Sequence, residues 1–217
     1  LREGGRMRLC PPTVERWAVG AKEEVRAGPL LYRPFPVGKR EPEALLEAVR
    51  ELRVDLEARV ASQVEEGLLV VDGPILFEWK RPVPVLGYVK SHWSQHLPPE
   101  RQEVLRGLRE GERTPAFAVE RQGRRFASWY LRLPGALGGS QLAAGILRVE
   151  APLAQGTRAL ADLSARLFAA WASSPMRDPR APQNLLPTGF LERELSRWMA
   201  PEDGVRRILL QHLERAS

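Results

Sequence analysis

The stretch Leu68-Leu69-Val70-Val71-Asp72-Gly73 is the most informative part of this chain. Apolar residues that favour strands are followed at once by one carboxylate and one glycine. The pattern predicts a short buried strand over 68–72 that presents Asp72 at its C-terminal end. A carboxylate in that position suits a bound divalent cation, whereas the alternative is an ordinary Asp-Gly turn.

A long helix is predicted just upstream, over 41–66, with Gly67 as its C-cap. Its apolar residues recur at spacings of three and four: Leu45, Val49, Leu52, Leu56, Val60 and Val64. Glu57 lies on the flank of this stripe, at the edge of the expected core. Two carboxylates that share a site repel unless a cation lies between them, so Glu57 and Asp72 together suggest Mg²⁺ or Mn²⁺. Such a metal would activate water and stabilise charge on a phosphate. The alternative is a solvated Glu57 paired with Arg53 or Arg50.

The rest of the chain predicts a mixed sheet followed by helices. Strands are expected over 75–79, 83–90 and 141–151, and a hairpin over 115–121 and 124–133 turns at Gln122-Gly123. Helices are expected from Pro98 to about 110, over 157–172, near 188–199 and over 203–215, with a Gly-rich loop at 134–139 and a Pro-rich one at 173–186. We therefore expect one α/β or α+β domain over 1–217. It would comprise irregular strands over 1–40 (among them Arg6–Cys10 and Leu30–Arg33), a helix plus central sheet over 41–151, and a helical part over 152–217.

Composition narrows the class of protein. The 217 residues carry a net charge of +6, and only four of the 33 basic residues are lysines. Arginine suits phosphate recognition, so a polyanionic partner is one explanation, and a GC-rich genome is the other. No apolar run approaches the roughly 20 residues of a membrane helix. The single cysteine, Cys10, excludes an internal disulfide and favours a reducing cytoplasm, while few Asn, Met and Cys residues suggest a thermophile.

Further charged residues follow the predicted strands. Lys90 ends a strand and would reach a phosphate or the attacking water, unless it is a plain surface lysine. His92 and His96 have the spacing of a metal-binding pair on a helix, but Pro98-Pro99 disfavours that helix and no third ligand is near. A zinc site is therefore not expected.

Strand 126–133 alternates in polarity. Trp129, Leu131 and Leu133 share one face, and Ser128, Tyr130 and Arg132 share the other. The second face, with Arg148 from the next strand, would either follow a nucleic-acid backbone or be a solvated polar surface. Glu150 would supply another carboxylate or pair near Arg148, and the sequence leaves both open.

Several motifs in order along the chain resemble the NurA family of DNA-repair nucleases, most closely its bacterial branch. They are Leu-Leu-Val-Val-Asp-Gly (68–73), Gly-Tyr-Val-Lys-Ser-His (87–92), Gly-Glu-Arg-Thr-Pro-Ala-Phe (111–117), Ser-Trp-Tyr-Leu-Arg-Leu (128–133), Leu-Arg-Val-Glu (147–150) and Asp-Pro-Arg-Ala-Pro-Gln-Asn-Leu (178–185). The resemblance covers roughly 41–200.

The resemblance implies an RNase H-like fold, with a mixed sheet flanked by helices and a helical C-terminal third, in a ring-shaped dimer. It implies a Mn²⁺- or Mg²⁺-dependent deoxyribonuclease, acting 5′–3′ as an exonuclease and on single strands as an endonuclease. The implied partners are single-stranded DNA, duplex ends and the hexameric HerA-type translocase ATPase, in the resection of DNA ends. Glu57 and Asp72 correspond to the family's helix Glu and strand-end Asp, and Lys90, Arg132 and Arg148 would contact phosphates.

The chain departs from the family pattern in two places. The family carries an earlier Asp-Gly on its first strand, and nothing before Trp17 supplies it; if residues precede Leu1, that Asp is expected among them. The family often has a C-terminal Tyr-Pro followed by a His, whereas this chain has Leu186-Pro187 and no His in 190–199. The alternative function is therefore a degenerate member that binds DNA or the translocase without cutting.

Overall fold

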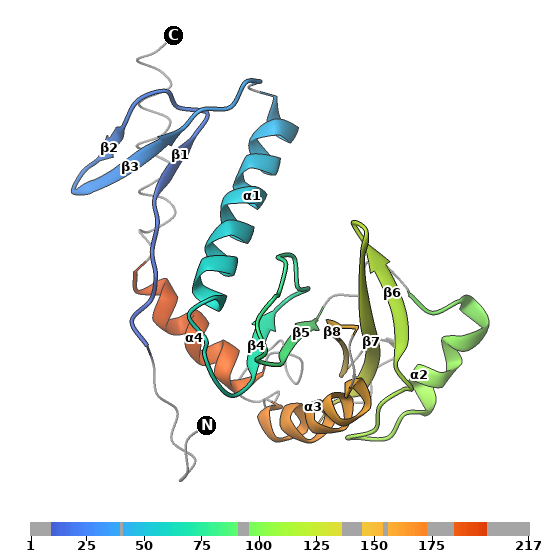
Figure 1. The fold of residues 1–217 in the computed structure, drawn as a ribbon. Coiled ribbons are helices and arrows are strands. Elements are labelled where there is room, and N and C mark those ends of the chain that lie inside the picture. Colours follow the sequence, from blue (N-terminus) through green and yellow to red (C-terminus); the bar gives the residue numbers. More distant parts are fainter. Residues whose placement is uncertain are drawn as a thin grey trace. The chain divides into compact units, whose positions relative to one another are not determined.

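The computed structural model describes residues 10–39, 41–90, 96–135, 145–153, 156–172 and 185–198 (Figure 1). The chain divides into two compact units. One contains the described residues up to Val60 and from Glu192, and the other is Ala61–Leu191. The expectation of a single domain over 1–217 stays a prediction.

The first unit carries a small sheet of three strands in the order β1-β3-β2. Its strands are β1 (Trp17–Val19), β2 (Val25–Ala27) and β3 (Leu30–Phe35). β3 runs parallel to β1 and antiparallel to β2. The sequence predicted β3 but neither of its partners, which have three residues each. The strand expected at Arg6–Cys10 falls almost wholly outside the described residues.

Helix α1 (Pro42–Ala61) confirms the long helix, but it ends five residues earlier than predicted. Val64 N donates to Ala61 O at 3.0 Å, an i−3 bond that tightens the chain and closes the helix. Gly67, with φ 86°, therefore turns the chain into the next strand and does not cap α1.

The second unit is built on a mixed sheet of five strands in the order β4-β5-β8-β7-β6 (Figure 1). The strands are β4 (Leu69–Asp72), β5 (Val85–Val89), β6 (Phe117–Arg121), β7 (Arg124–Arg132) and β8 (Ile146–Pro152). β4 and β5 are parallel, and the other pairs are antiparallel. The predicted mixed sheet is confirmed.

The inner strands β5, β7 and β8 are buried on both faces of this sheet. Helix α3 (Thr157–Trp171) covers one face, where Phe168 packs with Tyr88, Trp129, Leu131 and Leu133. On the other face, Tyr130 and Ile146 pack with Leu105 of α2 (Glu103–Gly107), which follows the short helix η1 (Pro99–Arg101). The predicted alternation along β7 is confirmed, but the face of Ser128 and Tyr130 is not a solvated surface, because both residues are buried.

The hairpin between β6 and β7 turns where the sequence predicts it. Gln122 and Gly123 have φ values of 52° and 71°, the left-handed pair that a tight two-residue hairpin requires. By contrast, the strand expected over 75–79 is wrong. Those residues form a loop whose backbone groups bind side chains of the sheet instead of another strand.

The last described helix is α4 (Leu186–Ser196), close to the predicted 188–199. The Pro-rich segment before Leu185 and the helix predicted over 203–215 lie outside the described residues.

Candidate functional site

Asp72 is the last residue of β4, as predicted, and pairs in register with Tyr88 of β5. Gly73 N donates to Tyr88 O at 2.9 Å, which keeps the strand ladder intact up to the carboxylate. Gly73 then has φ 112°, a conformation that L side chains rarely adopt, so the chain leaves the sheet immediately after Asp72. The Asp72 side chain is 41% exposed and therefore accessible to a ligand.

Lys90 provides the cation beside Asp72. Its Nζ lies 3.0 Å from Asp72 Oδ2 and 5.6 Å from the centre of the Tyr88 ring. Lys90 comes directly after β5, two residues beyond Tyr88, so the two side chains lie on the same side of the sheet. The parallel pairing of β4 and β5 thus brings together the strand-end Asp and Lys that the sequence predicted separately.

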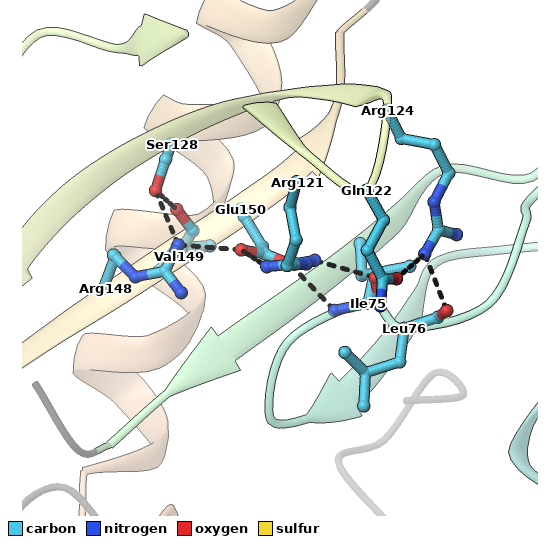
Figure 2. A network of polar contacts seen from close by, with 9 residues as sticks. All are labelled: Ile75, Leu76, Arg121, Gln122, Arg124, Ser128, Arg148, Val149 and Glu150. Carbon is cyan, nitrogen blue, oxygen red and sulfur yellow. Dashed lines mark hydrogen bonds and ion pairs between the residues drawn. The ribbon is translucent and has the colours of Figure 1, made fainter. Parts of the chain in front are cut away.

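A second polar cluster surrounds Glu150, whose side chain is fully buried (Figure 2). Its Oε1 accepts from Ile75 N at 2.8 Å and from Arg121 Nη2 at 2.7 Å. Its Oε2 accepts from Arg148 Nη1 at 2.7 Å and from Arg121 Nη1 at 3.2 Å. Every side of this carboxylate is therefore occupied by protein donors.

These donors keep Glu150 ionised. Burial raises the pKa of Glu150, but the hydrogen bonds and charges of Arg121 and Arg148 outweigh burial and hold the pKa below its ordinary value. Glu150 is therefore an anion at neutral pH, and its negative charge is balanced by the two arginines.

Asp72 and Glu150 point to opposite faces of the sheet. Asp72 pairs with Tyr88, whose ring packs on the α3 side, whereas Glu150 pairs with Gly87, the preceding residue of β5. Successive residues of a strand alternate in direction. Of the two alternatives for Glu150, the structure favours pairing with Arg148 over a carboxylate shared with Asp72.

A family model described as the NurA domain matches residues 10–186. The chain belongs to the NurA family. NurA proteins are a family of DNA-repair nucleases, and the family's substrate is DNA. No curated protein matches the chain. The strand-end Asp, Lys90 and the Glu150 cluster all lie within the matched NurA region.

Glu57, the other predicted NurA carboxylate, lies on α1 in the first unit, whereas Asp72 belongs to the second. Arg53 Nε lies 3.6 Å from Glu57 Oε1, at the i,i+4 spacing that the sequence offered as the alternative. This ion pair is partly exposed, so it contributes little to stability.

The basic residues predicted to contact DNA occupy three different environments. Lys90 is partly exposed beside Asp72. Arg132 donates from Nη2 to Leu105 O at 2.8 Å, which joins β7 to α2. Arg148 is buried, and its Nη1 also donates to Ser128 Oγ at 3.2 Å, so its guanidinium is held inside the sheet. Of the three, Lys90 is best placed to meet a phosphate.

The histidine pair that the sequence offered as a metal site is described only in part. His92 lies outside the described residues, and the described ranges contain no group of three or more His, Cys, Asp or Glu residues that could hold a metal. His96 is close to the Glu150 cluster, where burial first, and then the charge of Arg148, lowers the pKa of its imidazole. No helix among the described residues is long and apolar enough to cross a membrane.

Sequence reasoning missed Arg121 and Gly87. Arg121 ends β6 on the edge of the sheet, a place typical of a solvated charge, and only the fold brings its guanidinium to Glu150. Gly87 lies in the quoted Gly-Tyr-Val-Lys-Ser-His motif, and a glycine inside a strand was the available signal of a close backbone approach.

Proposed function

We propose that this chain is a metal-dependent DNA nuclease that cleaves 5′–3′ from duplex ends and cuts single strands. The observation that carries the proposal is the NurA family match together with Asp72, an accessible carboxylate at the C-terminal end of the edge strand β4. A nuclease of a DNA-repair family needs a group of this kind at its reacting phosphate.

Asp72 and Glu57 are the proposed ligands of Mn²⁺ or Mg²⁺. Carboxylate oxygens are hard ligands that suit these cations, and Asp72 fits as one of them. The bound metal would supply an activated water and stabilise charge on the phosphate. The described residues contain no group of three or more potential metal ligands, so Asp72 and Glu57 would need further ligands to complete the site.

Lys90 has two proposed tasks. In the free protein it balances the charge of Asp72 and holds the carboxylate in one orientation. Because an ammonium group is a mobile point charge on a flexible stem, Lys90 would turn to a phosphate oxygen when DNA binds. Arg132 and Arg148 stay predicted phosphate contacts, and the protein acceptors of Arg148 favour a structural role for it.

The broader setting is proposed from the family. It comprises an RNase H-like fold with a helical C-terminal third, a homodimer, and a HerA-type hexameric ATPase that feeds DNA ends to the nuclease. The mixed sheet of five strands with α3 on one face is consistent with such a fold.

A cleavage assay tests the proposal. Single-stranded and duplex DNA would be incubated with the protein and Mn²⁺, Mg²⁺ or EDTA, alongside Asp72→Asn. We expect cleavage that requires a metal and is abolished by Asp72→Asn, while DNA binding is mostly retained. Asp55→Asn, an exposed residue of α1, is the matched control and should cleave normally. An Asp72→Asn protein with wild-type cleavage would contradict the assignment.

A degenerate family member that binds DNA or the translocase without cutting is the second candidate. Two observations bear on it: residues 1–17 contain no Asp-Gly like the family's earlier one, and the described ranges contain no group of three potential metal ligands. DNA binding without cleavage in any metal would establish this alternative.

A further inference from the structure

The loop that follows Asp72 is attached to the sheet by side chains distant in sequence (Figure 2). Ile75 N donates to Glu150 Oε1, and Ile75 O accepts from Arg121 Nη2, both at 2.8 Å. Leu76 O accepts from Arg124 Nη2, also at 2.8 Å. Both hydrogen-bonding groups of the Ile75 backbone are therefore satisfied by the sheet, and the Ile75 side chain is fully buried.

Gly87 makes this attachment possible. A Cβ on residue 87 would lie 2.7 Å from Gly73 O and 3.0 Å from Ile75 Cγ1. Gly87 also pairs in register with Glu150, so the carboxylate reaches Ile75 N across the strand position that has no side chain. The loop residues 73–76 thus lie directly on β5.

Stability alone does not explain a cluster of this kind. Removing three charges from water costs several kcal/mol per ion, and a well-packed apolar group in the same place is often as stable or more so. In well-studied proteins, buried charges can instead specify one arrangement of the chain over its alternatives. Here the buried charges specify the arrangement of the loop 73–76, which begins directly after Asp72.

We propose that Glu150 is a positioning residue for Asp72, acting through the loop 73–76, with Arg121 and Arg148 holding Glu150 in place. Glu150 contacts neither a substrate nor the Asp72 side chain, since the two carboxylates lie on opposite faces. It fixes the backbone where β4 ends, and therefore the direction in which the Asp72 carboxylate points. The role of Asp72 in this inference rests on the proposed function.

Amide hydrogen exchange in Glu150→Gln tests the attachment without any assay of activity. Glutamine has nearly the same shape but no charge, and its amide nitrogen cannot accept from the arginines. The hydrogen bond to Ile75 N therefore loses its charge assistance and the side chain loses partners that hold it in place. We expect exchange in residues 73–76 to rise at least about tenfold, while the amides of α3 change much less. Glu120→Gln, which removes an exposed carboxylate from neighbouring β6, should leave exchange in 73–76 unchanged.

Gly87→Ala tests the same point without altering a charge, in case Glu150→Gln does not fold. The added methyl group must displace Gly73 and Ile75, so exchange in 73–76 should rise as in Glu150→Gln. Gly107→Ala, where a Cβ meets nothing within 4 Å, is the matched control. Val149→Ala changes a buried residue on the other face of β8, the strand that carries Glu150. It measures how much exchange rises throughout the second unit when the unit is destabilised in general.

Cleavage kinetics then separate positioning from a purely structural role. If the wild-type protein cleaves DNA, Glu150→Gln and Gly87→Ala should lower kcat at least tenfold with little change in DNA affinity, and Val149→Ala should not. Exchange in 73–76 that stays at the wild-type rate, or rises only as much as in Val149→Ala, would overturn the proposal. So would a wild-type kcat in both variants. If the wild-type protein does not cleave, the proposed function fails, and exchange still decides whether Glu150 holds the loop.

Discussion

Lys90 Nζ lies 3.0 Å from Asp72 Oδ2, across the parallel pair of β4 and β5. The two side chains are 26% and 41% exposed, so water screens their attraction and the pair contributes little to stability. A contact that is short but weakly stabilising is easily exchanged. The geometry therefore favours Lys90 as a group that can release Asp72 to a metal and turn to a phosphate.

Lys90→Met should lower DNA cleavage by at least tenfold and change the free energy of unfolding by less than about 1 kcal/mol. The reason is that Lys90 would contact the phosphate of bound DNA while adding little to folding. Lys80→Met is the matched control, because Lys80 Nζ also lies 3.0 Å from a carboxylate, that of Glu78, on a more exposed part of the unit. Cleavage rates and thermal unfolding of both variants give the comparison. Equal cleavage by Lys90→Met and Lys80→Met would contradict a role at the site.

The stabilisation that Glu150 provides should depend on pH in one direction. The pKa of Glu150 is lowered in the folded protein, so between that value and the unfolded value of about 4.3 the unfolded chain binds more protons. The free energy of unfolding of the wild-type protein should therefore fall as the pH drops below about 4.3. In Glu150→Gln, the part of this fall that comes from protonation of Glu150 should be absent. Urea unfolding of both proteins from pH 7 to pH 3 measures it. A difference between them that does not shrink at acid pH would show that the Glu150 charge is not stabilising.

Ser164→Ala should lower the free energy of unfolding by about 1–3 kcal/mol. Ser164 Oγ accepts from Trp129 Nε1 at 3.0 Å, and both residues are fully buried between α3 and the sheet. The variant leaves a buried indole N–H without its partner. Ser196→Ala is the control, because that hydroxyl binds Arg193 O on an exposed turn of α4 and should matter by less than about 0.5 kcal/mol. Similar urea midpoints for the two variants would refute the prediction.

Gly123→Ala should destabilise the hairpin between β6 and β7 by about 1 kcal/mol. Its φ of 71° is unfavourable for any residue with a Cβ, although nothing lies within 4 Å of the position, so backbone strain is the whole effect. Gly38→Ala, with equal space and no positive φ, should be neutral or slightly stabilising. Thermal unfolding of the two variants separates strain from lost chain entropy. A Gly123→Ala protein as stable as Gly38→Ala would show that the turn relaxes without cost.

The elements that could be predicted from the sequence are those whose signals are local. The Gln122-Gly123 turn, the helix α3 and the strand that ends at Asp72 follow from periodicity and from residues with special backbone conformations, because these forces act between near neighbours. The same patterns also showed that Trp129 and Tyr130 face opposite ways. They did not show that both faces are buried, because a strand's alternation says nothing about what covers each face.

The positions of the buried charges could not be predicted from the sequence and follow from the folded chain. Arg148 and Glu150 look like surface residues of a strand, yet they are buried, since Arg121 approaches them from 29 residues earlier in the chain than Glu150. Residues 75–79 have the composition of a strand but form a loop, because Glu150 and Arg121 bind the backbone groups of Ile75 that a neighbouring strand would otherwise bind. The partner of a buried charge is fixed by contacts between distant segments, and no local pattern records it.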